Sequence, residues 1–212
     1  GAEMHGTISG TAEYLADSDA HAIQIARDLM GKLSWKDRGS VPGPVDVVPP
    51  LYDIDELCGI VPSDTRHPYD VREVIARLVD GSDLLEFKAG WGSDTLCGNA
   101  RIQGQACGII ANQAPIQPEG SSKAAQFIQL CCQMNTPIIY LMNTTGYMVG
   151  KQAEQRGAIK HGAKMIQAVS NATVPQLTVV TGGGFGAGNY GMCGRGFDPR
   201  FIFSWPNSKV AV

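Results

Sequence analysis

The sequence lacks the features that mark several common classes of protein. Its 212 residues carry a formal net charge of −3, so there is no basic surface for a nucleic acid. No apolar run approaches the roughly 18 to 20 residues that cross a bilayer. The N-terminal stretch GAEMHGTISG has neither the charged region nor the apolar core of a secretory signal. These absences favour an intracellular protein that binds neither nucleic acid nor membrane.

Disulfide and metal-binding patterns are missing as well. The six cysteines form no C-x-x-C pair, and the four histidines are scattered without an H-E-x-x-H pattern. Cys107, Cys131 and Cys132 lie in apolar stretches, where cysteine usually serves as a small hydrophobe. We therefore expect buried, reduced thiols, a reducing compartment and no metal in this chain.

Two glycine-bearing stretches follow apolar runs: NTTGYMVG at 143–150 and GGGFGAGNYG at 182–191. The second contains G-x-G-x-x-G, but a dinucleotide site also needs a following helix and an acidic residue about 20 positions on. Here glycine and proline follow, and the window for the acid reads WPNSKVAV. Neither stretch has the lysine of a P-loop, and no G-x-S-x-G marks a hydrolase nucleophile. Dinucleotide, P-loop and serine-hydrolase sites are thus excluded.

Hydrophobic periodicity predicts an α/β protein. Helices are expected at 17–33, capped by Asp17 or Ser18, and at 70–81, where Asp70 and Glu73 have capping-box spacing and Gly81 ends the helix. Three consecutive strands with short turns predict antiparallel neighbours, and the later alternation of strand and helix predicts parallel strands with crossover helices. The further elements are strands at 84–89, 95–102, 106–112, 137–143, 176–180 and 201–205, and helices at about 121–134 and 155–169.

The prolines of SVPGPVDVVPP at 40–50 predict an extended connection between two packed units. The chain begins without Met and stops soon after the strand FIFSW. We therefore interpret it as an interior fragment of a longer protein.

The glycine-bearing stretches allow a chemistry that rests on the backbone. The first amides of a helix have no intrahelical partner and favour negative charge, so two of them can hold an oxyanion. Alternatively, the glycines only allow helix and strand to pack closely, and the residues alone leave both interpretations open. Asn189 and Tyr190 beside these amides either line a pocket or pack. The charged side chains of other segments are interpreted as surface or interface residues: Lys88, Asp94, Arg101, His161 and Lys164.

Three longer stretches resemble one family: YDVREVIARLVDGSDLLEFKAG, NTTGYMVGKQAEQRGAIKHGAKM, and the run from HGAKMIQAVSNATVPQLTVV through GGGFGAGNYGMCGRGFDPR to KVAV. They are similar to the carboxyltransferase β subunits of biotin-dependent acyl-CoA carboxylases. GAGNYGMCGR and NTTGYMVG resemble the branch that acts on 3-methylcrotonyl-CoA or geranyl-CoA, with HPYDVREVI and SNATVP closer to the geranyl-CoA type. Propionyl-CoA and acetyl-CoA enzymes instead tend to have GGAY-type loops.

The resemblance implies a fold of crotonase-like domains, each a ββα superhelix. Residues 1–40 would be the end of the N-terminal carboxyltransferase domain, 41–64 a linker, and 65–212 an incomplete C-terminal domain. It also implies a β-subunit hexamer, a biotin carboxylase and biotin carrier α subunit as partner, and a location in the bacterial cytoplasm or the mitochondrial matrix.

The resemblance further implies a mechanism without a protein base. Carboxybiotin on the partner releases CO2, the biotin anion takes a proton from the γ carbon of the branched enoyl-CoA, and the carbanion attacks CO2. The backbone amides of Ala187 and Gly188 would hold the biotin ureido oxygen, and Gly146, Tyr147, Gly186, Asn189 and Tyr190 would line the biotin and acyl pocket. The oxyanion hole for the thioester would lie outside this chain, so the fragment alone would be inactive.

The sequence leaves alternatives open. One is a propionyl-CoA or acetyl-CoA carboxyltransferase, another a CoA-thioester hydratase or decarboxylase of the same superhelix. A third, from a different class, is a noncatalytic scaffold subunit of such a complex.

Overall fold

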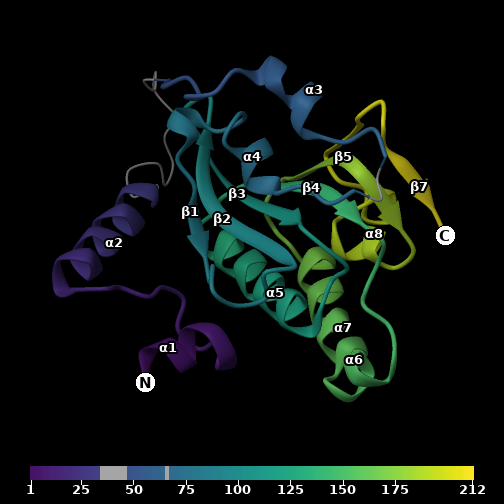
Figure 1. Cartoon of the computed structure of the whole chain (residues 1–212), viewed down its shortest axis with the longest axis horizontal. Helices are drawn as coiled ribbons and strands as arrows, with labels where there is room; N and C mark the ends of the chain where they lie inside the picture. Colours follow the sequence, from purple (N-terminus) through teal and green to yellow (C-terminus); the bar gives the residue numbers. More distant parts are fainter. Residues whose placement is uncertain (34–46, 65–66) are drawn as a thin grey trace.

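A computed structural model describes residues 1–33, 47–64 and 67–212. At its centre lies a mixed sheet with strand order β1–β2–β3–β4–β5–β6, and β7 pairs with β5 (Figure 1). The first three strands are antiparallel and the remaining pairs are parallel, as the sequence predicts. The strands are β1 (Leu85–Phe87), β2 (Thr95–Ile102), β3 (Gln105–Asn112), β4 (Ile138–Thr144), β5 (Gln176–Phe185), β6 (Phe201–Ser204) and β7 (Lys209–Ala211).

Helices cover both faces of the sheet, because successive side chains of a strand point to opposite sides. Tyr140 and Met142 of β4 pack in the cluster that contains the apolar side chains of α5 (Pro118–Gln133) and α7 (Ala158–Ser170). Leu141 between them packs in the other cluster, with α4 (Val71–Ile75). Figure 1 shows α5 and α7 together on one side and α4 on the other.

The remaining helical segments are short, except α2. They are α1 (Ala2–Met4), η1 (His5–Ser9), α2 (Asp19–Lys32), η2 (Ile54–Glu56), α3 (Leu57–Ile60), η3 (Asp80–Ser82), α6 (Lys151–Gln155), α8 (Gly188–Gly191) and η4 (Arg195–Phe197). The helix expected at about 155–169 is confirmed as α7, and the short helix α6 before it was not predicted. Gly157 separates them with a φ of +83°, a left-handed conformation that ends a helix.

The predicted helix at 17–33 is confirmed as α2. Ser18 is its N-cap and accepts a hydrogen bond from the backbone N–H of His21 at 3.2 Å. Ile23 and Met30 on this helix remain more than half exposed, at 55% and 53%. The helix therefore stands on the surface of the described chain (Figure 1).

The helix predicted at 70–81 is shorter than expected. Asp70 caps α4, but it accepts from the N–H of Arg72, and Glu73 pairs with Arg77 instead of completing a capping box. After Ile75 the chain continues in tight turns, since Arg77 and Leu78 donate to carbonyls three residues back. Of the apolar side chains in this segment, Val71, Val74, Ile75 and Val79 are buried, and Leu78 is half-buried.

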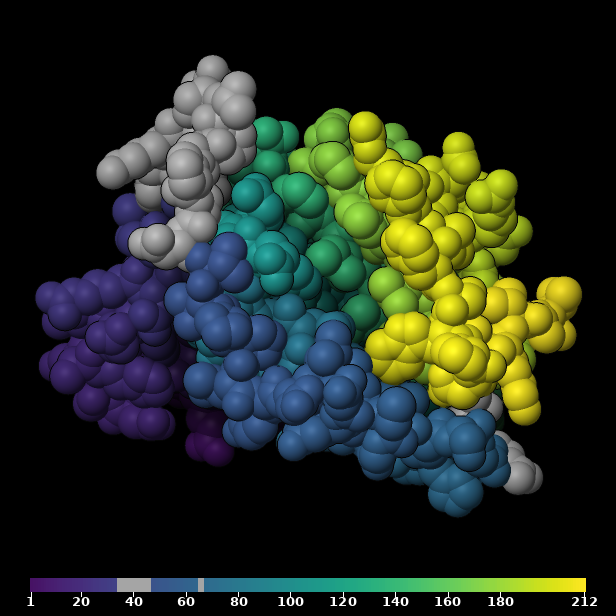
Figure 2. All heavy atoms as spheres, turned by 90° about the horizontal axis from the view of Figure 1, so that it is seen from above, coloured from purple at the N-terminus to yellow at the C-terminus, as the bar shows by residue number. Residues whose placement is uncertain are grey.

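The segment 47–64 crosses the surface, and Figure 2 shows its blue atoms between the purple N-terminal helices and the yellow C-terminal strands. Its short helices pack Leu57 and Ile60 against the cluster around α4. The prolines of the expected connection before residue 47 lie outside the described residues.

Two charged side chains expected at the surface are buried, and the prediction is wrong for both. Lys88 is 2% exposed, and its ammonium group donates to the carbonyl of Gly10 and to Glu13 Oε1. Asp94 is 7% exposed and accepts from the N–H of Gln117 and the hydroxyl of Thr95. Burial raises the pKa of the Asp94 carboxyl. Arg101 is half-buried and donates to the Gly104 carbonyl.

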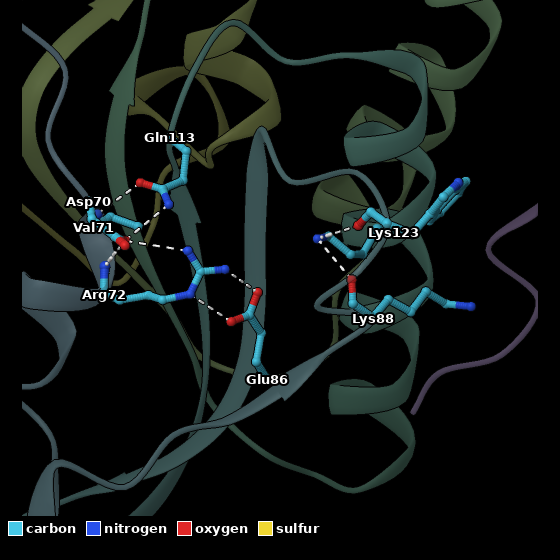
Figure 3. A network of polar contacts seen from close by, with 8 residues as sticks. Asp70, Val71, Arg72, Glu86, Lys88, Gln113 and Lys123 are labelled. Atoms are coloured by element: carbon cyan, nitrogen blue, oxygen red, sulfur yellow. Dashed lines mark hydrogen bonds and ion pairs between the residues drawn. The ribbon is translucent and has the colours of Figure 1, made fainter. Parts of the chain in front are cut away.

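A third charged side chain, Lys123, is buried close to Lys88. Lys123 of α5 is fully buried, and burial lowers its pKa. Its ammonium group donates to the carbonyls of Trp91 and Lys88, at 2.7 and 3.4 Å. Figure 3 shows Lys123 beside Lys88, and next to them the Arg72–Glu86 ion pair between α4 and β1. Sequence pattern misses these residues because charge alone predicts exposure.

All six cysteines are free thiols. Cys97, Cys107, Cys131 and Cys193 are buried, as expected, and Cys132 is half-buried. Cys58 is exposed, so the prediction of burial is wrong there, because Leu57 and Ile60 of α3, and not Cys58, pack against the cluster around α4. Within the described residues, no helix has the length and apolar character needed to cross a membrane.

Candidate functional site

The two glycine-bearing stretches meet at the ends of β4 and β5. A Cβ added at Gly188 would lie 2.8 Å from Cα of Gly146, and one at Gly191 would lie 2.3 Å from the Tyr147 hydroxyl oxygen. Ile116 links to the first stretch through its N–H, which donates to the Gly146 carbonyl at 2.9 Å. The tertiary structure therefore brings Gly146 and Tyr147 beside Gly188, about 40 residues further along the sequence.

The run Gly182–Gly184 belongs to β5 and not to a loop, which corrects the sequence interpretation. A Cβ at Gly182 would lie 2.3 Å from Asn143 Oδ1, and one at Gly184 would lie 2.7 Å from the Met142 sulfur. For these glycines close packing is the reason for the residue type. The turn into α8 starts only at Gly186, whose φ is +52°.

The turn from Gly186 to Gly188 leaves two amides bare. Gly186 donates its N–H to the Ala211 carbonyl of β7 at 3.0 Å, and Asn189 donates to the Gly186 carbonyl at 3.2 Å. Between them, the N–H groups of Ala187 and Gly188 donate to no acceptor among the described residues. Ala187 is exposed, and Gly188 is buried beside the Gly146 stretch. Two adjacent donors of this kind suit a single anionic oxygen.

The neighbouring stretch is fixed by its own hydrogen bonds. Thr144 Oγ1 accepts from the Gly146 N–H and donates to the Gly146 carbonyl, both at 3.1 Å. Gly146 has a φ of +116°, which favours glycine. The Tyr147 ring packs against Gly162 of α7 and Gly191 of α8, and burial raises the pKa of its hydroxyl. Tyr147 thus acts mainly as a packing residue between two helices.

The side chains of Asn189 and Tyr190 lie on different sides of the turn, one toward β5 and one at the surface. The Asn189 carboxamide turns toward β5, where Nδ2 donates to the Gly184 carbonyl at 3.5 Å. Tyr190 is 50% exposed, and its ring meets Phe197 edge-on with centroids 5.7 Å apart. Asn189 therefore supports the turn from inside, whereas Tyr190 borders it at the surface.

The buried titratable groups near the turn stay protonated at neutral pH. Burial raises the pKa of Cys193 to about 11, and the pKa of Tyr147 is raised as well. His161 lies on α7 and is hydrogen-bonded to Ser122, while Lys164 is exposed. Chemistry at this turn would therefore rest on backbone donors.

Two cavities lie near these elements. An open groove of about 640 Å³ runs between α5 and α7 and includes Gln126, Lys164 and Gln167. A second cavity, of about 470 Å³, borders the Gly146 stretch at Met148, Val149 and Lys151. Within residues 1–33, 47–64 and 67–212 no group of three or more His, Cys, Asp or Glu could hold a metal ion.

Comparison with known proteins assigns the whole chain to one family. The carboxyl transferase domain family matches residues 1–212, which is the entire chain. The chain belongs to the carboxyl transferase domain family. Its fold is the crotonase-like fold of these domains, as the sequence resemblance predicts.

Two solved structures are similar to this carboxyl transferase domain. The crystal structure of the β subunit of Pseudomonas aeruginosa geranyl-CoA carboxylase is 57% identical with a TM-score of 0.78, and the match covers all of this chain and 41% of that one. The transcarboxylase 12S structure is 38% identical with a TM-score of 0.91, covering all of this chain and 43% of that one.

Curated proteins similar to this chain include β subunits of acyl-CoA carboxylases. The probable biotin-dependent acyl-coenzyme A carboxylase β2 subunit of Mycobacterium tuberculosis is 53% identical over all of this chain and 40% of its own length. The mitochondrial methylcrotonoyl-CoA carboxylase β chain of Dictyostelium discoideum is 49% identical over all of this chain and 36% of its own. This chain therefore spans about two fifths of the relatives that it matches.

Proposed function

We propose that this chain is part of the carboxyltransferase β subunit of a biotin-dependent acyl-CoA carboxylase. The subunit would move CO2 from carboxybiotin to the γ carbon of a branched enoyl-CoA, geranyl-CoA or 3-methylcrotonyl-CoA. The observation that carries the proposal is the pair of bare amides at Ala187 and Gly188 in a carboxyl transferase domain.

The residues of this turn suit the ureido group of biotin. Biotin on a partner subunit would supply the carboxyl group and, after its loss, an anionic ureido oxygen. The Ala187 and Gly188 N–H groups would donate to that oxygen from a backbone already held in place by the Gly186–Ala211 hydrogen bond. Such prearranged donors stabilise a developing oxyanion because they need no reorganisation during the reaction. Gly146, Tyr147, Gly186, Asn189 and Tyr190 would surround the biotin and acyl groups.

The domain organisation belongs to the same proposal. Residues 1–40 would end the N-terminal carboxyltransferase domain, 41–64 would link, and 65–212 would form part of the C-terminal domain. In the whole protein we expect β subunits to assemble as the transcarboxylase 12S relative does, which forms a hexamer. A biotin carboxylase and carrier subunit would be the partner, in the bacterial cytoplasm or mitochondrial matrix.

The experiment that tests this function uses the full-length β subunit, produced with its biotinylated partner. ATP-dependent fixation of bicarbonate is measured with geranyl-CoA, 3-methylcrotonyl-CoA and propionyl-CoA side by side. We expect a kcat/KM at least about 10-fold higher for one of the branched enoyl-CoA substrates than for propionyl-CoA, because the acyl chains differ by two or more carbons and one methylene in an apolar pocket is worth about 10-fold or more.

Each other outcome contradicts a defined part of the proposal. Propionyl-CoA as the best substrate would overturn the branched substrate class and favour a propionyl-CoA carboxyltransferase. No fixation with any of the three, in a complex that assembles, would favour a noncatalytic scaffold.

A further inference from the structure

The pairing of β4 with β5 shifts next to the candidate site. Met142 is opposite Val180, but Thr144 is opposite Gly184, so two steps along β4 match four along β5. A shift of this kind takes backbone groups out of the regular ladder, and buried amides then need other acceptors. The affected amides lie just before the turn that carries Ala187 and Gly188.

Two asparagine side chains accept from these amides. Asn112 at the end of β3 accepts from the Asn143 N–H through Oδ1 at 3.2 Å. Asn143 in turn accepts from the Gly183 N–H through its own Oδ1 at 2.9 Å. The side chains thus connect the carboxyl ends of β3, β4 and β5, three neighbouring parallel strands.

The Asn143 carboxamide is closely surrounded. A Cβ at Gly182 would lie only 2.3 Å from its Oδ1, so the amide rests directly on the backbone of β5. The carboxamide also interacts with the Tyr69 hydroxyl, and that hydroxyl contacts Thr181 Oγ1 at 3.3 Å. The contacts with Gly182 and Gly183 hold the carboxamide against β5.

These contacts determine where β5 ends. Gly183 is tied to Asn143, Gly184 pairs with Thr144 and Val210, and Gly186 donates to Ala211. The turn with the bare amides follows immediately. We propose that Asn143 is a positioning residue for the carboxyl transfer: it sets the path of β5 and so aims the Ala187 and Gly188 amides. The inference rests on the proposed function of this turn.

The test compares two substitutions of Asn143 in the full-length β subunit with its biotinylated partner. Asn143→Leu has a similar volume and no acceptor, whereas Asn143→Asp keeps an oxygen that can accept from the Gly183 N–H. We expect Asn143→Leu to lower kcat about 10- to 100-fold, as a displacement near 1 Å does. The KM for the acyl-CoA should stay within about threefold, and Asn143→Asp should keep at least about a third of the wild-type kcat.

A second variant approaches the same contact from the other strand. Gly182→Ala keeps Asn143 but displaces its carboxamide from β5, and we expect a similar loss of kcat. The double variant with Asn143→Leu should be no worse than either single variant, because both remove one contact. If the Asn143→Leu variant does not assemble, the kcat of Gly182→Ala tests the positioning role of Asn143.

The outcomes separate this inference from the proposed function. A wild-type complex without turnover overturns the function itself. An active wild type with undiminished kcat in Asn143→Leu or Gly182→Ala overturns the positioning role alone. An Asp variant as impaired as the Leu variant also overturns it, because the acceptor would then not be the feature that matters.

Discussion

The variant Ala187→Pro is expected to lower the kcat of the assembled carboxylase by about 100-fold or more, the effect of removing one oxyanion donor. Proline has no N–H, and it fixes φ near −65°. Ala187 already has a φ of −67°, its side chain is exposed, and its amide donates to no acceptor among the described residues. The substitution therefore deletes a donor with little strain at residue 187 itself.

The matched control is Ala187→Ser, which keeps the N–H at the same exposed position. Steady-state fixation of bicarbonate, together with the size of the complex, measures both variants. We expect the Ser variant to keep most of the wild-type kcat and both variants to assemble. Equal kcat in the Pro variant and wild type would contradict the assignment of the Ala187 amide. Gly188 is a poorer place for proline, since any Cβ there meets the backbone of Gly146 at 2.8 Å.

The variant Gly120→Ala is expected to reduce the free energy of unfolding by about 2 to 4 kcal/mol, the sum of overpacking and a lost buried hydrogen bond. A Cβ at Gly120 would lie 2.0 Å from Asp94 Oδ2 and 2.6 Å from Thr95 Oγ1. The Asp94 carboxylate cannot move away without losing its hydrogen bonds to the Gln117 N–H and the Thr95 hydroxyl. Because Gln117 is the N-cap of α5, the start of this helix would be displaced.

Gly31→Ala provides the control for the same chemical change. Gly31 lies in α2, and a Cβ there meets nothing within 4 Å. Alanine should therefore be neutral or stabilise by up to about 1 kcal/mol through helix propensity. Urea denaturation of the full-length subunit measures both variants. If the clash causes the loss, adding Gly120→Ala to an Asp94→Ala background should cost far less than in wild type, and an equal cost in both would contradict the explanation.

The Asp94 region shows why the buried charges were beyond sequence analysis. Lys88 and Asp94 come from two different turns and Lys123 comes from a helix, and no local pattern connects them. Their burial depends on the carbonyls of Gly10 and Trp91, which reach the lysines only in the folded chain. Charge alone predicts exposure for such residues, because an unpaired charge is costly to bury.

Alternating and helical hydrophobic patterns predicted most strands and helices, since these patterns follow from the geometry of each element. They also predicted the strand directions, because short turns join antiparallel strands and long crossovers join parallel ones. They could not place β7, whose residues are all exposed, nor the ends of α4 and the break between α6 and α7. Those features depend on individual turn hydrogen bonds and on the φ of Gly157.

For the candidate site, the sequence by itself determined the family, and the resemblance predicted that the amides of the GAGNYG stretch hold an anionic oxygen. Only the tertiary structure decided that Gly182–Gly184 are strand residues held against Asn143 and Met142, and that the Ala187 and Gly188 amides have no acceptor among the described residues. The reason is physical: a motif records which residues lack side chains, but whether a given amide is bonded depends on neighbours from distant strands, here Asn143 of β4 and Ala211 of β7.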